Sequence, residues 1–127
     1  MAAVDAEEPR HEEVSRFLAA LRGPIFLPDL VLTEAAQLVV SRIGSIAEAH
    51  FIRGIAASGV VVIHTEHEDL VRIAELLEIY SDQRLGTVDA AVVALAERLG
   101  VTTIATLDHR HFAPIRPRHA PRFELVP

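Results

Sequence analysis

The chain has no cysteine, lysine or tryptophan, and only 5% of its 127 residues are aromatic. Without cysteine, disulfides and thiolate metal sites are excluded. No apolar run approaches the ~18 residues that a membrane-spanning helix needs. The acidic N-terminus, MAAVDAEEPRHEE, does not have the pattern of a signal peptide. From the sequence alone we therefore expect a cytoplasmic protein.

The net charge and the length of the chain limit which kind of protein it can be. The formal net charge is −6, and all twelve basic residues are arginine. A dedicated nucleic-acid-binding protein is usually basic, but a nuclease that holds cations with carboxylates can be acidic overall, because the metal supplies positive charge at the site. Arginine grips phosphate bidentately, although a total absence of lysine is more typical of biased coding composition. The length and the 50% apolar content predict one domain with a substantial core.

Hydrophobic periodicity and breaker residues predict an alternation of helices and strands. The expected helices cover residues 9–21, 30–43, 45–57, roughly 66–79 and 87–99, and the expected strands cover 25–27, 60–63, 101–106 and 123–126. Strands that alternate with helical segments give an α/β layered fold with a mostly parallel sheet. For the fourth helix, Thr65 and Glu68 have the spacing of a capping box, and Leu70, Ile73, Ala74 and Leu77 form the expected buried face.

The stretch from Tyr80 to Phe112 carries the strongest functional pattern. Thr87 is a candidate N-cap, the following helix has an apolar stripe, and Gly100 supplies the left-handed residue that ends it. Asp89 lies in the first turn of this helix, and Asp108 directly follows the next strand. In a parallel α/β unit, helix N-termini and strand C-termini share one edge of the sheet. Two carboxylates there suit Mg²⁺ or Mn²⁺, although a helix dipole and ordinary loop chemistry also favour these acids.

A third acid, Glu34, borders the apolar stripe of the helix expected at 30–43. A carboxylate beside a core needs a partner, because burying it unpaired is costly. A cation is one partner, and a hydrogen bond to a threonine or an arginine is the alternative. Glu34 lies in the second turn, near the same kind of helix N-terminus as Asp89.

Three pieces, LPDLVLTEAAQL, YSDQRLGTVDAAVVALAERLG and IATLDHRHF, occur in this order with fitting gaps. Together they resemble the PIN-domain family, and within it the VapC-type toxins of toxin–antitoxin systems. The resemblance implies a three-layer α/β/α fold and a Mg²⁺- or Mn²⁺-dependent endoribonuclease. Carried over residue by residue, it implies metal-binding and catalytic roles for Glu34, Asp89 and Asp108, a further acidic metal position at Asp82, and a site-lining hydroxyl at Thr106.

One part of the family pattern has no match. The family begins with a strand that ends in an aspartate, the first metal ligand, followed by threonine or serine. Residues 1–5 correspond instead to the end of the first helix and the next turn, so Asp5 is not given that role. We expect residues 1–127 to be a single PIN domain that lacks this strand and most of the first helix, because the chain start was assigned too late or the chain was truncated.

The resemblance also implies partners: an RNA substrate, a VapB-type antitoxin and a second copy of the chain in a homodimer. Possible RNA contacts come from a basic tract after Asp108 that contains Arg110, Arg116 and Arg118, although a solvated loop is an equal interpretation. His109 and His111 flank Asp108, but the spacing is a weak signal for metal ligands. The alternative function is a truncated, non-catalytic PIN-like module that binds an antitoxin or sister subunit. A receiver domain would need a lysine, which the chain lacks.

Overall fold

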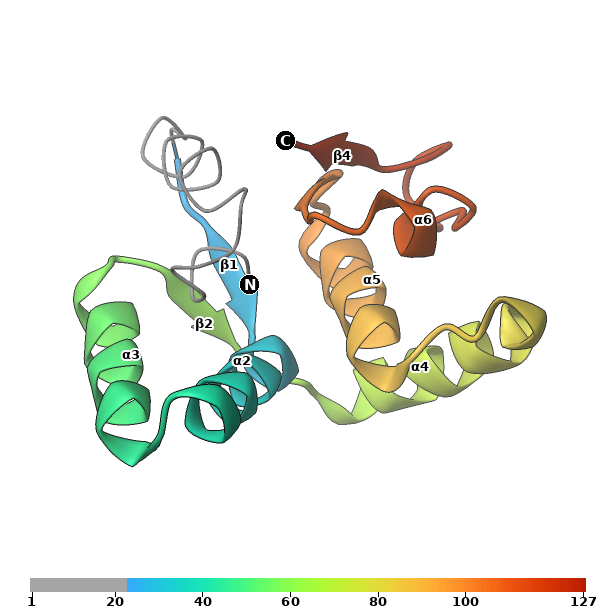
Figure 1. Ribbon diagram of the computed structural model, residues 1–127. Helices are drawn as coiled ribbons and strands as arrows, with labels where there is room; N and C mark the ends of the chain where they lie inside the picture. Colours follow the sequence, from blue (N-terminus) through green and yellow to red (C-terminus); the bar gives the residue numbers. More distant parts are fainter. Residues whose placement is uncertain (1–22) are drawn as a thin grey trace. The chain divides into compact units, whose positions relative to one another are not determined.

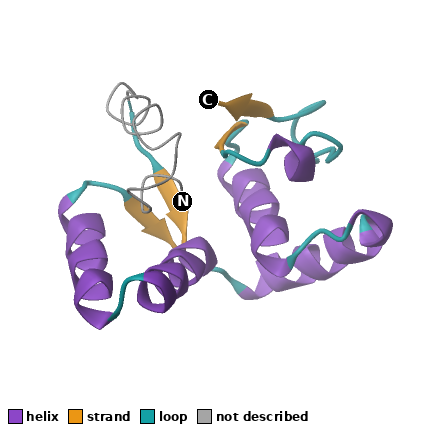
Figure 2. Cartoon of the chain, in the orientation of Figure 1, coloured by secondary structure: helices purple, strands orange, loops and turns teal. Residues whose placement is uncertain are grey.

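The computed structural model describes residues 23–127 of the chain (Figures 1 and 2). The helix expected over Pro9–Leu21 lies outside the described residues. The chain divides into two compact units, Met1–Ile63 and His64–Pro127, and each is described by itself. Within the described residues, no helix combines the length and apolar character that crossing a membrane requires.

The described part of the first unit is a β-α-α-β arrangement. Its elements are β1 (Phe26–Pro28), α2 (Asp29–Arg42), α3 (Ser45–Ala57) and β2 (Val61–Ile63). The two strands pair in parallel, with Leu27 opposite Val62. Parallel strands need a crossover connection, and the two helices supply it. The expected elements are therefore confirmed; β1 lies one residue later than predicted, and β2 is one residue shorter.

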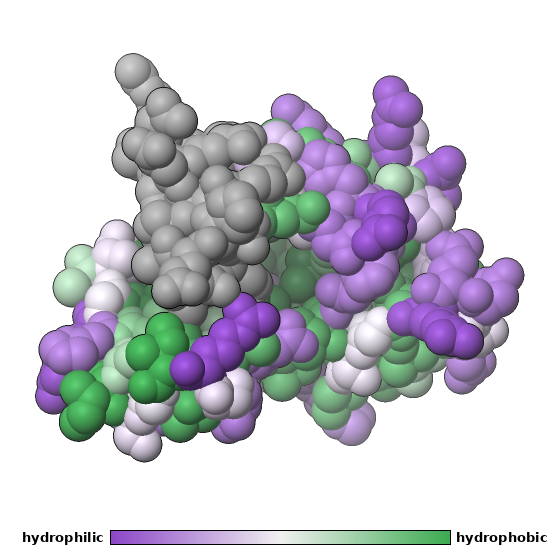
Figure 3. Space-filling view, viewed as in Figure 1, coloured by the Kyte–Doolittle hydropathy of each residue, from purple (hydrophilic) through white to green (hydrophobic). Residues whose placement is uncertain are grey.

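Helix α2 starts one residue earlier than expected, because Pro28 is the N-cap and Asp29 is already helical. Ala35 and Val39 form its buried face. Gly44 separates α2 from α3 with a φ of 109°, a left-handed conformation that glycine adopts without strain. Apolar side chains around this turn are exposed, notably Ile46 at 75%, and Figure 3 shows green apolar surface on this hairpin.

The second unit is built around two packed helices. Its elements are α4 (His67–Ile79), the 3₁₀ turn η2 (Ser81–Gln83), α5 (Thr87–Leu99), β3 (Thr103–Ala105), α6 (His109–Phe112) and β4 (Glu124–Val126). β3 and β4 pair in parallel, with Ile104 opposite Leu125. Both ladders in the described residues are thus parallel, which confirms the α/β class with parallel strands.

Helix α5 is buried on more than the single stripe that its sequence predicts. Ala90, Val93 and Ala94 are at most 2% exposed, whereas the expected stripe member Leu99 is 37% exposed. Figure 1 shows the physical reason: α5 lies between α4 and the C-terminal segment, so it buries two faces. A buried two-sided helix has a weak single-face periodicity. The helix nevertheless ends as expected, at a left-handed Gly100.

The start of α4 differs from the expected capping box by one residue. Glu66 is the N-cap, and its backbone N–H donates to the Asp69 carboxylate at 2.8 Å. Asp69 is 2% exposed and also accepts hydrogen bonds from the Arg98 guanidinium. The buried face of α4 therefore runs through Asp69, Ile73 and Leu76, whereas Leu70, which was expected inside, is 54% exposed. The helix is therefore rotated about its axis relative to the prediction, because Asp69, with its two sets of partners, takes a place in the buried face.

A second ion pair joins α4 to α5. Arg72 donates to both carboxylate oxygens of Glu97, at 2.8 and 3.0 Å, and both side chains are nearly buried. The backbone N–H of Arg118 donates to the same carboxylate at 2.8 Å. These bonds lower the pKa of Glu97, although burial alone would raise it. Glu97, near the end of α5, thus ties two helices and the C-terminal segment together.

Candidate metal centre

Asp89 is presented by the first turn of α5. The N-cap is Gly86, one residue before the expected Thr87, and Asp89 follows as the third residue of the helix. The adjacent Ala90 is fully buried, so the backbone that carries Asp89 is fixed in the core. The side chain itself is 28% exposed. The position is favourable for an anion because the helix N-terminus carries a partial positive charge.

Asp108 is presented by the turn that follows β3. Thr106 fixes this turn twice: its backbone N–H donates to the Val126 carbonyl at 2.8 Å, and its hydroxyl accepts a hydrogen bond from the Asp108 N–H at 3.0 Å. Asp108 is also the N-cap of the one-turn helix α6. Its Oδ1 atom is buried and has no hydrogen-bond partner. A buried carboxylate oxygen without a donor is costly, and a cation is one way to compensate it.

His111 lies against both acids. Its Nδ1 is 3.1 Å from Asp89 Oδ2 and 3.3 Å from Asp108 Oδ2. The helix α6 makes this possible, because it brings His111 back over Asp108 three residues earlier in the chain. The sequence pattern was only a weak indication of a role for this histidine, since His-x-His in a loop is common. The short helix that orients the ring was not predicted.

The electrostatics of Asp89 follow from this arrangement. Burial raises the pKa of the Asp89 carboxyl, and the neighbouring Asp108 raises it further, while His111 opposes both effects without cancelling them. The environment therefore disfavours the charged form of Asp89. A bound divalent cation would reverse that balance, because it favours both carboxylates in their ionised state.

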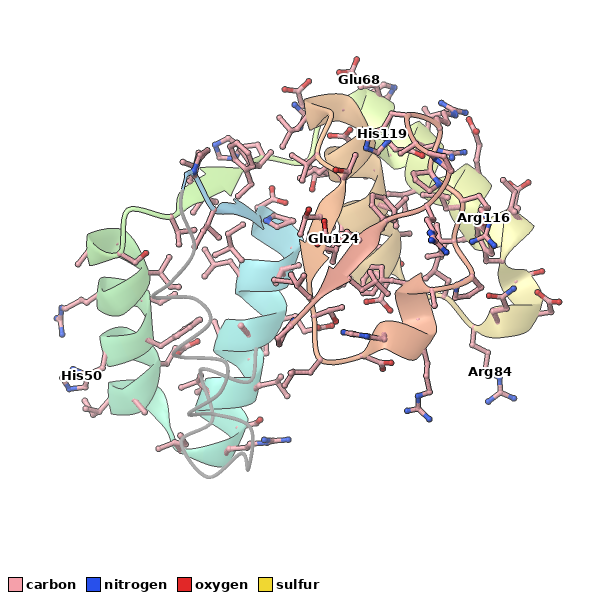
Figure 4. The ribbon with its side chains drawn as sticks, turned by 90° about the horizontal axis from the view of Figure 1, so that it is seen from above. His50, Glu68, Arg84, Arg116, His119 and Glu124 are labelled. Atoms are coloured by element: carbon pink, nitrogen blue, oxygen red, sulfur yellow. The ribbon has the colours of Figure 1, made fainter. Side chains whose placement is uncertain are left out.

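The other two predicted acids stand apart from this contact. Glu34 is an exposed residue in the second turn of α2, in the first unit, and its meeting with Asp89 and Asp108 stays a prediction. Asp82 is exposed in η2, two residues before Arg84, whose left-handed backbone ends the turn. Figure 4 shows Arg84 extending away from the ribbon at this point. A metal role for Asp82 also stays a prediction.

The three arginines that were named as possible RNA contacts differ in their bonding. Arg110 is 93% exposed, and its Nε lies 3.8 Å from Asp108 Oδ1. The Arg118 guanidinium is instead paired with Glu75 at 2.7 Å. The Arg116 backbone N–H donates to the Tyr80 hydroxyl at 2.8 Å, and its guanidinium donates to the Ala113 carbonyl. Arg110 is therefore the member that projects beside the acids.

The donor set fits a divalent cation in its chemistry but is not arranged around one. In residues 23–127, no group of three or more histidine and acidic side chains is placed to hold an ion. Two carboxylates, one with an unpartnered buried oxygen, nevertheless meet at a helix start and a strand end. Hard oxygen donors of this kind suit Mg²⁺ or Mn²⁺. Asp89 and Asp108 are the residues that would hold the ion.

An α/β chain with parallel strands and paired acids at this edge has the features of the PIN class. The profile of the PIN domain matches residues 1–116, and the chain belongs to that family. Its relatives include ribonuclease VapC26 of Mycobacterium tuberculosis (strain ATCC 25618 / H37Rv), 35% identical over 127 residues, which are 100% of this chain and 94% of the relative. The resemblance to VapC-type toxins is confirmed.

A solved structure supports the fold independently. The crystal structure of the Mycobacterium tuberculosis toxin VapC20, described as a sarcin–ricin loop cleaving toxin, matches with a TM-score of 0.74. The match covers 80% of this chain and 78% of the other, at 22% sequence identity. At this identity the likeness concerns the fold alone, and it confirms the expected PIN-like α/β architecture.

Proposed function

We propose that the chain is a VapC-like toxin that cleaves RNA phosphodiester bonds as a metal-dependent endoribonuclease. The observation that carries this proposal is the meeting of Asp89 and Asp108 around one nitrogen, at the start of α5 and the end of β3. The whole-length identity to a ribonuclease of the same family supports it. The acids that this family's function requires thus include two carboxylates that contact the same histidine nitrogen in this chain.

The residues would divide the work as follows. Asp89 and Asp108 hold the cation, and we propose that Glu34 and Asp82 complete its surroundings. The cation, Mg²⁺ or Mn²⁺, would orient and activate water and stabilise charge on the transferring phosphate. Thr106 keeps Asp108 in place through its hydroxyl. The protein need supply no covalent nucleophile.

Arg110 is the residue of the basic tract that we propose to contact RNA. Its guanidinium is exposed and lies beside Asp108, where a phosphate next to the metal would arrive. Arg116 and Arg118 remain possible contacts of the same strand, although their guanidinium groups already donate to Ala113 and Glu75. A contact to phosphate makes binding sensitive to salt, so loss of Arg110 should flatten the salt dependence of RNA binding.

The partners follow from the same proposal. We propose a VapB-type antitoxin that covers the acidic site, a homodimer built through α2 and α3, and a cytoplasmic location. The exposed Ile43 and Ile46 on that hairpin are compatible with a contact between copies. We also keep the proposal that residues 1–127 act together as one PIN domain.

The test is cleavage of a structured RNA with Mg²⁺ or Mn²⁺, compared between the unsubstituted chain, Asp89→Asn and the matched control Glu78→Gln. Glu78 is an exposed acid on α4, so its replacement removes a carboxylate away from the paired acids. We expect cleavage by the chain and by Glu78→Gln, and loss of cleavage in Asp89→Asn and on addition of a chelator. Retained activity in Asp89→Asn would refute the proposed site. A folded chain that binds Mn²⁺ but never cleaves would instead favour the non-catalytic binding module.

A further inference from the structure

His111 links the two acids through one ring nitrogen. A single Nδ1 lies within 3.3 Å of a carboxylate oxygen from each of Asp89 and Asp108. At these distances Nδ1–H acts as a donor shared by two acceptors. The ring therefore places positive or partly positive hydrogen where the two negative groups face each other, which is the role that a cation has in a loaded site.

The same nitrogen cannot serve as a metal ligand while it carries this proton. A ligating imidazole must offer a lone pair, whereas Nδ1 here donates. Mg²⁺ in addition prefers oxygen ligands to nitrogen. In the part of the chain that the structure describes, no three such side chains are placed to hold an ion.

The His111 ring lies at the surface of the protein. Its side chain is 47% exposed, and it belongs to a helix of only four residues at the surface. Asp89 and Asp108 are anchored more firmly, by α5 and by the Thr106 hydroxyl respectively. If a metal ion and the His111 ring compete for the two carboxylates, we therefore expect the ring to move and the carboxylates to stay in place.

We propose that His111 is an intramolecular competitor of the metal ion: its ring holds Asp89 and Asp108 together in the metal-free protein, and the arriving cation displaces it. This inference rests on the proposed metal site and adds a positioning residue to it. Its cost to metal binding is that of a partly exposed contact between a ring nitrogen and two carboxylates. By that measure, removing the ring tightens metal binding about two- to fivefold.

The experiment is a calorimetric titration with Mn²⁺ at one fixed pH, for the unsubstituted chain, His111→Ala and His109→Ala. His109 is exposed on the same short helix and serves as the matched control. We expect tighter binding for His111→Ala and no change for His109→Ala. A ligand role predicts the opposite sign, so weaker binding of His111→Ala overturns the inference, and so does an unchanged affinity.

A spectroscopic measurement on the unsubstituted chain makes the result independent of any variant's folding. We expect the His111 ring resonances to shift on saturation with diamagnetic Mg²⁺, and Mn²⁺ bound to the protein to show no magnetic coupling to an imidazole nitrogen. Nitrogen coupling, or ring resonances that do not move, would contradict the displacement. If neither the unsubstituted chain nor His111→Ala binds a metal, the proposed site itself fails; binding without an effect of His111 removes only this inference.

Discussion

Without metal, the Asp89→Asn variant should be more stable than the unsubstituted chain. With metal present, it should be less stable than the unsubstituted chain. The sign comes from the raised pKa of Asp89: burial raises it most, attraction to His111 opposes this, and repulsion from Asp108 raises it further. Burial and repulsion penalise the charged carboxylate in the folded state, and the neutral amide avoids both. Asparagine also retains an oxygen that accepts the His111 N–H.

The magnitude follows from the geometry. Both carboxylate oxygens lie within 3.3 Å of Nδ1, so they are at most about 6.4 Å apart, the sum of the 3.1 and 3.3 Å contacts. Two unit charges at that distance repel by roughly 2.6 kcal/mol at an effective dielectric of 20, and by less than about 1 kcal/mol in bulk water. Partial exposure of both side chains places the repulsion near the lower value. After the weaker hydrogen bond to an amide is subtracted, we expect a gain of about 0.5 kcal/mol or less in unfolding free energy.

The assay is urea denaturation of both proteins, first with a chelator and then with Mn²⁺. At a concentration a hundredfold above the dissociation constant, the metal should add about 2.7 kcal/mol to the unsubstituted chain and far less to Asp89→Asn. The order of stability therefore reverses between the two conditions. The advantage of the variant without metal should also fade as pH falls through the folded pKa of Asp89, because the acid then becomes neutral as well.

Two outcomes would refute this reasoning. An Asp89→Asn protein that is less stable than the parent in chelator would mean that the carboxylate is favoured where it stands. An equal gain from Mn²⁺ in both proteins would mean that Asp89 does not hold the ion. Glu78→Gln, which removes an exposed acid from α4, should follow the unsubstituted chain in both conditions.

Three further predictions concern the supports of the site. Arg72→Ala leaves the nearly buried Glu97 without its main partner, and we expect a loss of about 3–5 kcal/mol in unfolding free energy by chemical denaturation; a loss below about 1 kcal/mol would contradict the role of this pair. The pKa of Glu97 is lowered from 4.5 in the folded state, so its contribution to the unfolding free energy is full above the unfolded pKa and is lost as pH falls through the folded pKa. The loss of stability on acidification should therefore be less steep in Glu97→Gln. An unchanged pH dependence would refute the assignment. Thr106→Val removes the acceptor of the Asp108 N–H, so it should lower the unfolding free energy by about 1 kcal/mol and weaken Mn²⁺ binding. The control is Thr103→Val, at an exposed position of β3, which should leave the metal affinity unchanged.

The secondary structure was predictable where chain breakers and apolar runs coincide. Gly44 and Gly100 mark helix boundaries, and the four described strands lie within or one residue from their predicted positions. Helix phase was less predictable, because periodicity assumes that one face is buried. The predicted face of α4 was wrong at Leu70 and Ala74, which are exposed, because Asp69 is inside. One of the partners that make this buried acid favourable is Arg98, 29 residues away. No local pattern contains that information.

The candidate site divides in the same physical way. The sequence was enough to predict that Asp89 and Asp108 lie close together. In a parallel α/β unit, helix N-termini and strand C-termini share one edge of the sheet, and this depends on chain topology alone. The position of His111 could not be predicted, because its contact depends on a single helical turn after Asp108 and on a ring orientation, which composition and spacing do not specify. A sequence pattern therefore finds the groups that would hold an ion, whereas the group that competes with the ion is found only in three dimensions. That difference is what makes the His111→Ala titration decisive: it examines the one member of the cluster whose role is defined by geometry rather than by motif.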